Sequence, residues 1–184
     1  NISKPDVSGN VFIQRDEIPV IYKCAAGTFT WLTADAKSMV SKEILAPDLR
    51  SLAALTIDAG GKHYEIQIKN ADEGNEEVLL DGKNAEMESF RNLYYMLIVQ
   101  SADEVLFDGI PNTNGMEKKA EVTFIYADGS KEADKVVYYG ESARKLCVVL
   151  NDRERGYRAK ASGLETFLQN LEKFAAGETI EARY

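Results

Sequence analysis

Histidine is the side chain most often used for proton transfer near neutral pH, and this chain has one, His63. His63 alternates out of phase with the apolar residues Tyr64 and Ile66 and in phase with the polar residues Glu65 and Gln67. This alternation predicts a strand whose polar face carries a solvated His63. Because the sequence offers neither a second histidine nor a cysteine cluster, it predicts no metal site.

Other catalytic patterns are missing from the sequence. It contains no nucleophile elbow, Walker loop or dinucleotide-binding fingerprint, and nothing near His63 favours a serine–histidine triad. The acidic run at residues 70–77 faintly resembles a calcium-binding loop, but it lacks the EF-hand spacing, so a solvated turn is favoured. We therefore expect a non-enzymatic protein with no catalytic residues, no metal and no cofactor.

Two tyrosine pairs are the most suggestive binding features, Tyr94-Tyr95 and Tyr138-Tyr139. In each pair one ring can face the core while the other faces outward, and exposed tyrosines are common in binding surfaces. This makes Tyr95 and Tyr139 weak candidates for binding residues. The alternative is that both are half-buried packing residues, and Trp31 is likewise expected to pack rather than to bind a ligand.

The two cysteines, Cys24 and Cys147, both fall in strand-like runs, and their spacing matches no metal-binding or redox motif. Two buried free thiols are the favoured interpretation. A disulfide is the alternative, because its geometry cannot be derived from sequence.

The composition excludes several classes of partner. The net charge of −8 over 184 residues argues against nucleic-acid binding and against electrostatic attraction to anionic lipid, because both need clustered Lys and Arg. The longest nearly apolar run, residues 93–99, is too short to span a bilayer. The chain starts with polar residues and shows no signal peptide, so we expect that any targeting or anchoring segment has been removed.

The clearest pattern covers residues 52–100. Alternating apolar and polar residues predict two strands around Gly60-Gly61, and residues 76–81 predict a third before a turn at Asp81-Gly82. A helix then follows, with Asn84 as its predicted N-cap. Its apolar stripe is expected to lie across the sheet. The stripe consists of Met87, Phe90, Leu93, Tyr94 and Leu97.

The first 51 residues predict a hairpin followed by a helix. Strands are expected at residues 11–14 and 20–23, with Pro19 marking an exposed edge because proline cannot donate a ladder hydrogen bond. The helix is expected within residues 26–42. A shorter helix that begins at Thr33 is the alternative.

The last third predicts more strands and a second clear helix. Ser162 and Glu165 form a capping-box pattern at the start of that helix, and Gly177 is a plausible stop. Its apolar stripe is Leu164, Phe167, Leu168, Leu171 and Phe174. The strands are expected at residues 104–107, 121–126, 135–139, 146–150 and 157–159.

An internal repeat links the two ends of the chain. Residues 11–32 can be laid without a gap on residues 147–168, and both stretches have the order strand, polar turn, strand, helix. We expect an α+β fold of antiparallel sheets covered on one face by amphipathic helices, with repeated hairpin–helix modules. Residues 1–51 would hold a partial module and residues 52–184 a complete one, with an internal boundary in the Gly-, Pro- and Asn-rich residues 108–119.

Longer segments resemble a known family. The runs LRSLAALTIDAGGKHYEIQIK and EEVLLDGKNAEMESFRNLYYMLIVQSADEVL, the ending ASGLETFLQNLEKF and the early segment NVFIQRDEIPVIYKCAAGTFTWL are similar to a bacterial domain-of-unknown-function family, the one numbered 4340. The resemblance covers roughly residues 11–178. It carries over no catalytic residue, because the family has none that is accepted.

The resemblance implies a location and a class of partner. Members of that family usually have one N-terminal membrane segment and present the rest outside the cytoplasmic membrane, many as accessory proteins of ABC-2 type exporters. It therefore implies a membrane-tethered, extracytoplasmic interaction domain, with an exporter permease or ATPase as candidate partner. The alternatives are a binding module for a cell-envelope peptide or glycan, and an unrecognised hydrolase centred on His63.

Overall fold

A computed structural model describes residues 1–16, 18–28, 40–69, 76–129 and 132–181. The chain divides into two compact units, Asn1–Ser41 and Lys42–Tyr184, called here the first and second units. Each is described by itself. Among the described residues, no helix is long and apolar enough to cross a membrane.

The first unit contains a two-stranded antiparallel sheet of β1 (Asn10–Gln14) and β2 (Ile21–Ala25). The start of the chain extends this sheet along the side of β1 that faces away from β2. There the Ser3 N–H donates to the Phe12 carbonyl oxygen at 2.9 Å. β1 therefore has a pairing partner on each side.

Two predictions for this unit need comment. Pro19 was expected to mark an exposed edge of this hairpin; it lies in the connection just before β2, and no described strand pairs with the outer edge of β2. The helix predicted within residues 26–42 lies largely outside the described residues, as does Trp31.

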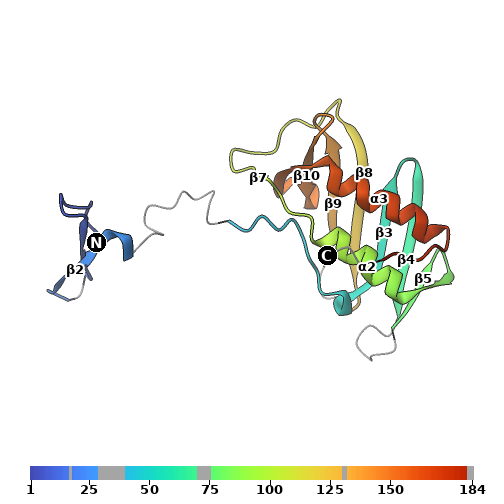
Figure 1. The fold of residues 1–184 in the computed structure, drawn as a ribbon, viewed down its shortest axis with the longest axis horizontal. Coiled ribbons are helices and arrows are strands. Elements are labelled where there is room, and N and C mark those ends of the chain that lie inside the picture. The colour runs from blue at the N-terminus through green and yellow to red at the C-terminus, as the bar shows by residue number, and fades with distance from the viewer. Residues whose placement is uncertain (17, 29–39, 70–75, 130–131, 182–184) are drawn as a thin grey trace. The chain divides into compact units, whose positions relative to one another are not determined.

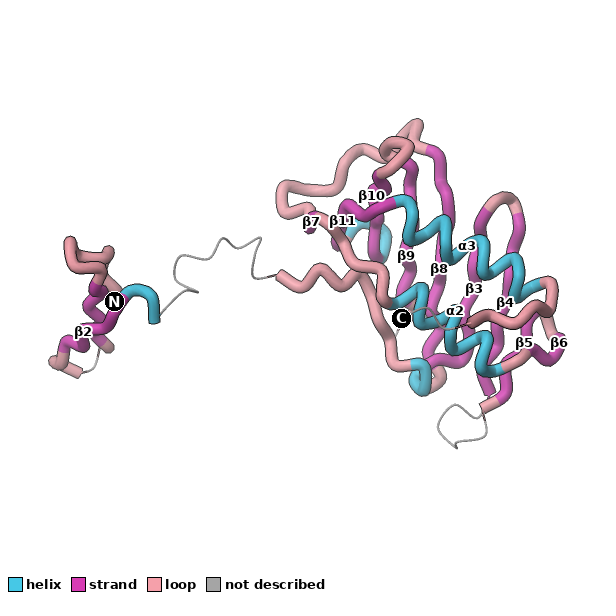
Figure 2. Tube along the Cα trace, viewed as in Figure 1, coloured by secondary structure: helices cyan, strands magenta, loops and turns pink. Residues whose placement is uncertain are grey.

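The second unit is built on one antiparallel sheet, in which nine strands are described (Figure 2). Their order across the sheet is β6-β5-β4-β3-β8-β9-β10-β11-β7. Of the predicted loop and boundary at residues 108–119, residues 108–116 lie within this unit between β7 and β8, and residues 117–119 belong to β8. The strands are β3 (Leu52–Ala59), β4 (Lys62–Lys69), β5 (Glu77–Leu80), β6 (Lys83–Ala85), β7 (Glu104–Val105), β8 (Glu117–Tyr126), β9 (Asp134–Gly140), β10 (Lys145–Leu150) and β11 (Arg155–Lys160).

Two tight turns of the sheet sit where Gly60-Gly61 and Asp81-Gly82 predicted them. Gly60 and Gly61, between β3 and β4, have φ of 58° and 76°. Asp81 and Gly82, between β5 and β6, have φ of 47° and 77°. Two central residues with positive φ make a hairpin turn whose twist matches that of the flanking strands, and glycine adopts this conformation without steric cost.

The first helix of this unit, α2 (Met87–Ile98), begins later than predicted. Asn84 is not its N-cap, because Asn84 belongs to β6 and pairs with β5. Glu86 caps the helix instead: its carboxylate accepts from the Glu88 and Ser89 N–H groups at 2.9 and 2.6 Å. A carboxylate in this place also complements the positive end of the helix dipole.

The second helix, α3 (Ala161–Ala175), lacks the predicted capping box. Strand β11 runs up to Lys160, which is the N-cap and makes no side-chain capping bond, so Ser162 falls within the first turn. The predicted stop at Gly177 is confirmed, with φ of 79°. The last carbonyl groups are satisfied by the N–H groups of Gly177 and Glu178, in the paired bonds of a Schellman motif.

The C-terminal tail folds back from α3 onto α2. Ile180 is 2% exposed. Its N–H donates to Ser89 Oγ at 2.9 Å, and its carbonyl oxygen accepts from Asn92 Nδ2 at 2.8 Å. The tail therefore closes the core next to α2 with one apolar side chain and two hydrogen bonds.

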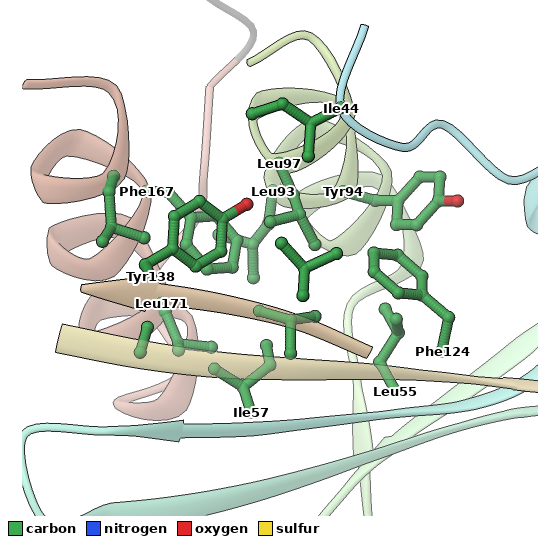
Figure 3. Close-up of a cluster of buried hydrophobic side chains, with 14 of the residues drawn as sticks. Ile44, Leu55, Ile57, Leu93, Tyr94, Leu97, Phe124, Tyr138, Phe167 and Leu171 are labelled. Carbon is green, nitrogen blue, oxygen red and sulfur yellow. The ribbon is translucent and has the colours of Figure 1, made fainter. Parts of the chain in front are cut away.

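The core lies between the sheet and the two helices, which cover the same face (Figure 3). Both predicted helical stripes face it, with Met87 and Leu168 only partly buried at its margin. Each fully buried large side chain contributes about 1.5–3 kcal/mol. The largest fully buried side chains are Phe90, Phe124, Phe167, Leu52, Leu55, Ile57, Ile66, Leu93, Leu164, Leu171, Ile180 and Val78.

The mostly antiparallel sheet with two helices confirms the α+β class. The predicted internal repeat aligned residues 11–32 with residues 147–168, and this alignment differs by one residue from the one that the strand pairing gives. Each residue of the β1–β2 hairpin corresponds in pairing to the residue 135 positions later, not 136, in the β10–β11 hairpin. The corresponding pairs are Asn10–Ala25 with Lys145–Lys160, and Gln14–Ile21 with Val149–Gly156.

Candidate functional site

Within the described part of the second unit, one face of the sheet carries no helix. Both helices lie on the opposite side of the sheet (Figure 1). We call the uncovered side of strands β4, β3, β8 and β9 the open face. The pairing register places these side chains on it: His63, Glu65, Gln67, Ala54, Thr56, Asp58, Lys118, Glu121, Thr123, Ile125, Lys135 and Tyr139, together with Val137, which is buried at 6% exposed.

His63 lies on this face, as the sequence predicted, and it is exposed. It stands opposite Asp58 across β3 and β4, with 2.8 Å between Nδ1 and the Asp58 carboxylate. The hydrogen bond and the charge of Asp58 raise the pKa of His63 above its ordinary value. The pair therefore favours the protonated imidazole in the folded protein.

Glu121 continues the same row on β8, directly opposite Asp58. Two neighbouring carboxylates repel each other, and here two lysines offset that repulsion. The Glu121 carboxylate lies 3.0 Å from Lys118 Nζ and 3.5 Å from Lys135 Nζ. With His63 and Asp58, these groups form a cluster of opposite charges that spans β4, β3, β8 and β9.

A second group of charged side chains lies around β11, which is separated from the strands of the open face by β10. Arg158 on β11 holds two carboxylates: its Nε is 3.0 Å from Glu141, and its Nη1 is 3.0 Å from Glu104. Hydrogen bonds to Glu104 and Glu141 raise the pKa of Arg158 further. This pairing ties β11 to β7 and to the loop after β9.

The loop after β7 covers this part of the sheet. A Cβ atom at Gly156 would come within 2.7 Å of Ile110 Cγ1, so the loop crosses β11 where the side chain is absent. Arg153 Nη2 donates to Thr113 Oγ1 at 3.0 Å and holds the loop further on. The open face is therefore the part of the sheet that this loop leaves uncovered.

The two candidate binding residues do not come together. Tyr139 is half-buried on the open face, across from Lys118. Tyr95 is half-exposed on α2, on the other side of the sheet. The expected inward orientation of their neighbours is confirmed, since Tyr94 and Tyr138 are buried in the core. Burial raises the pKa of both core phenols.

Both thiols are free, and they differ in burial. Cys147 is fully buried on β10, and burial together with the charge of Glu141 raises the pKa of its thiol. Cys24 on β2 is only half-buried, which corrects the expectation of two buried thiols. A raised pKa lowers the thiolate fraction, so Cys147 is a packing residue with low reactivity.

The larger hollows among the described residues include two that lie on the helix side of the second unit, away from the open face. One, of about 460 Å³, is bounded by the β5–β6 hairpin, the start of α2 and the chain after α3. The other, of about 360 Å³, lies between the ends of β8 and β9 and the start of α3. Neither is lined by Tyr95, Tyr139 or His63.

The described residues show no group of three or more His, Cys, Asp or Glu side chains that could hold a metal ion. Residues 70–75 of the acidic run lie outside the described part of the chain. No family model matches the chain. Curated proteins and solved structures likewise give no significant match.

Sequence reasoning missed the ion pairs of Glu121 and Arg158. Glu121 was part of a recognised strand, but its partners come from before the predicted strand and from β9. The alternation of charged and apolar residues along β8 did indicate a polar face. Which charges meet on that face depends on strand order, which has no local signal.

Proposed function

We propose that this protein is a non-enzymatic interaction domain that binds a partner protein through the open face. The observation that carries the proposal is a four-stranded surface on which the described residues place no helix, and whose charges are held in ion pairs within β8 and between neighbouring strands. Strands about 4.8 Å apart and six residues long give roughly 400 Å², about half of what each partner contributes to a standard interface. Charged side chains that are already paired within the domain add little to the binding free energy, but they determine how a partner can align on the surface.

We further propose that the partner is the permease or ATPase of an ABC-2 type exporter, and that the full-length protein is membrane-tethered and extracytoplasmic. The support is the resemblance to the exporter-associated family numbered 4340, over roughly residues 11–178. The acidic net charge of −8 suits contact with a protein rather than with anionic lipid.

The repeated hairpin–helix module remains part of this proposal. It is supported by the shared pairing register of the β1–β2 and β10–β11 hairpins, and by α3, which follows β11 directly. A protein made of such modules would present several sheet faces in series. Each face would offer a separate contact to a large membrane partner.

The test is cross-linking of the full-length protein in its native cells, purification from the membrane fraction and mass spectrometry of the proteins that accompany it. We expect an exporter permease or ATPase. A protein recovered alone, or outside the membrane fraction, would refute the exporter proposal.

A pair of matched variants tests the surface. Thr123→Arg places a long cation in the middle of the open face, and Thr166→Arg does the same on α3, where the threonine is also half-buried. Thr123→Arg should abolish recovery of the partner while Thr166→Arg preserves it. Equal recovery with both variants would show that the partner binds elsewhere.

Binding of a cell-envelope peptide or glycan is the second candidate. The observation that favours it is the half-buried Tyr139 beside Lys118 on the open face, an aromatic ring next to a cation. Titration with peptidoglycan fragments, followed by NMR, tests it. Shifts confined to β8 and β9 would support it, and unchanged spectra would reject it.

A further inference from the structure

Strand β2 is an edge strand of the first unit, as far as the described residues show. The backbone of Phe12 on β1 is hydrogen-bonded to Ser3, on the side away from β2. Because bonding alternates along a strand, the neighbours of Phe12, Val11 and Ile13, are the residues of β1 that bond to β2. On β2 this pairing turns the backbone N–H and C=O groups of Ile21, Lys23 and Ala25 away from β1. Among the described residues, no strand pairs with these groups.

The side chains of this edge are unusually apolar for a solvent-facing strand. Ile21 is 64% exposed and Tyr22 52% exposed, and Val20 just before them is also exposed. An exposed apolar edge strand is a template for a further strand, which can pair with the backbone and cover the side chains.

The second unit shows what a strand on such an edge looks like. By pairing register, β11 corresponds to β2, with Tyr157 in the place of Tyr22 and Arg158 in the place of Lys23. The outer edge of β11 is occupied by β7, which is antiparallel to it.

The contacts of β7 define the chemistry of the occupant. Val105 lies opposite Tyr157, and Glu104 lies opposite Arg158 with 3.0 Å between the charged groups. The backbone bonds from Asp103 N–H to the Arg158 carbonyl oxygen and from Leu106 N–H to the Gly156 carbonyl oxygen measure 2.8 and 3.0 Å. On β7 an acidic residue is followed by a β-branched one. The acidic residue lies opposite the cation of β11, and the β-branched residue lies opposite its tyrosine.

We propose that β2 binds an extended segment of a partner protein, antiparallel to the strand, with an acidic residue opposite Lys23 and a β-branched apolar residue opposite Tyr22. The carbonyl oxygens of Ile21 and Lys23 accept hydrogen bonds from that segment. This site lies in the first unit and is independent of the open face.

A second copy of the chain is a poorer occupant. If two β2 strands paired antiparallel over their full length, the central residue of one would stand opposite the central residue of the other. That residue is Lys23, so two like charges would meet directly. An acidic segment replaces this repulsion with attraction.

The test uses the whole chain and a labelled octapeptide with the sequence of residues 101–108, SADEVLFD, read by fluorescence anisotropy. We expect saturable binding. Lys23→Glu should raise the dissociation constant about fivefold or more, because a cross-strand ion pair becomes a like-charge pair. A peptide with lysine in the place of Glu104 should bind the Lys23→Glu protein about as well as the original pair.

Lys4→Glu is the matched control, since it makes the same charge change at another exposed lysine of the first unit. It should leave binding unchanged. Amide shifts at Ile21, Lys23 and Ala25 should accompany binding in NMR spectra. Three outcomes overturn the proposal: no saturable binding, equal effects of both lysine variants, or shifts at β11, where the peptide would have displaced β7.

Discussion

The β1–β2 and β10–β11 hairpins share a pairing register and differ in almost everything around them. Tyr157 is 4% exposed, because α3 and the core cover it, whereas its counterpart Tyr22 is 52% exposed. Val11 in the first unit is nevertheless as buried as Leu146 in the second. Burial of a hairpin residue is therefore decided by the elements that cover it, and a two-stranded sheet has few of them.

The largest difference in stability is expected between alanine variants of the two equivalent tyrosines, Tyr157 and Tyr22. Tyr157→Ala removes a buried ring and should lower the free energy of unfolding by about 3 kcal/mol. Tyr22→Ala should change it by less than about 0.5 kcal/mol, because its ring is already half in water. Urea unfolding followed by circular dichroism measures both. Equal losses would show that the first unit is covered as fully as the second.

The next largest effect on stability is expected at Gly156 on β11, compared with Ile21, which occupies the equivalent position on β2. Gly156→Ala should cost about 1–2 kcal/mol, because the new Cβ meets Ile110 and the covering loop must move. Ile21→Ala should be nearly neutral, since Ile21 points into solvent. Thermal unfolding of both variants checks this, and a neutral Gly156→Ala would mean that the loop is loosely held.

Thiol chemistry gives a third measure of coverage. Cys24 should react with a maleimide roughly tenfold faster than Cys147 or more, because Cys147 is fully buried and its thiol pKa is raised. The rates can be separated with Cys24→Ser and Cys147→Ser variants. Comparable rates would require frequent opening of the sheet around β10.

The smallest effect is expected at His63, which stands on the exposed hairpin of β3 and β4. As the single histidine, it gives one imidazole signal in a proton NMR titration. Its pKa should lie above 6.5 and fall toward that value in Asp58→Asn. Because the folded pKa is raised, the pair stabilises the fold below the unfolded pKa of 6.5, and this contribution is lost as pH rises through the folded pKa. An unchanged pKa in Asp58→Asn would contradict the pair.

Much of the second unit could be predicted because its signals are local. Gly60-Gly61 and Asp81-Gly82 mark the turns of two hairpins. Apolar residues spaced three and four apart identify the faces of both helices that pack on the core. The helix starts could not be predicted in the same way. Asn84 is drawn into β6 by pairing with β5, and strand β11 continues up to the residue before α3.

The candidate site depended on information that is not local. His63 could be placed on a polar face by alternation alone. The row that it forms with Asp58 and Glu121 needs β8 beside β3, although residues 60–116 separate these strands in the chain. Arg158 likewise meets Glu104 on β7, a strand that was expected at residues 104–107 but whose pairing with β11 has no local signal.

The tail at Ile180 has a consequence for how the protein is made. Synthesis proceeds from the N-terminus, so the sheet strands leave the ribosome before α3 and the tail do. Until residue 180 has emerged, Ser89 and Asn92 lack their tail contacts and the core beside α2 stays open to water. The second unit can therefore complete its packing only after residue 180 has left the ribosome, and a nascent chain stalled before that point would need protection from aggregation.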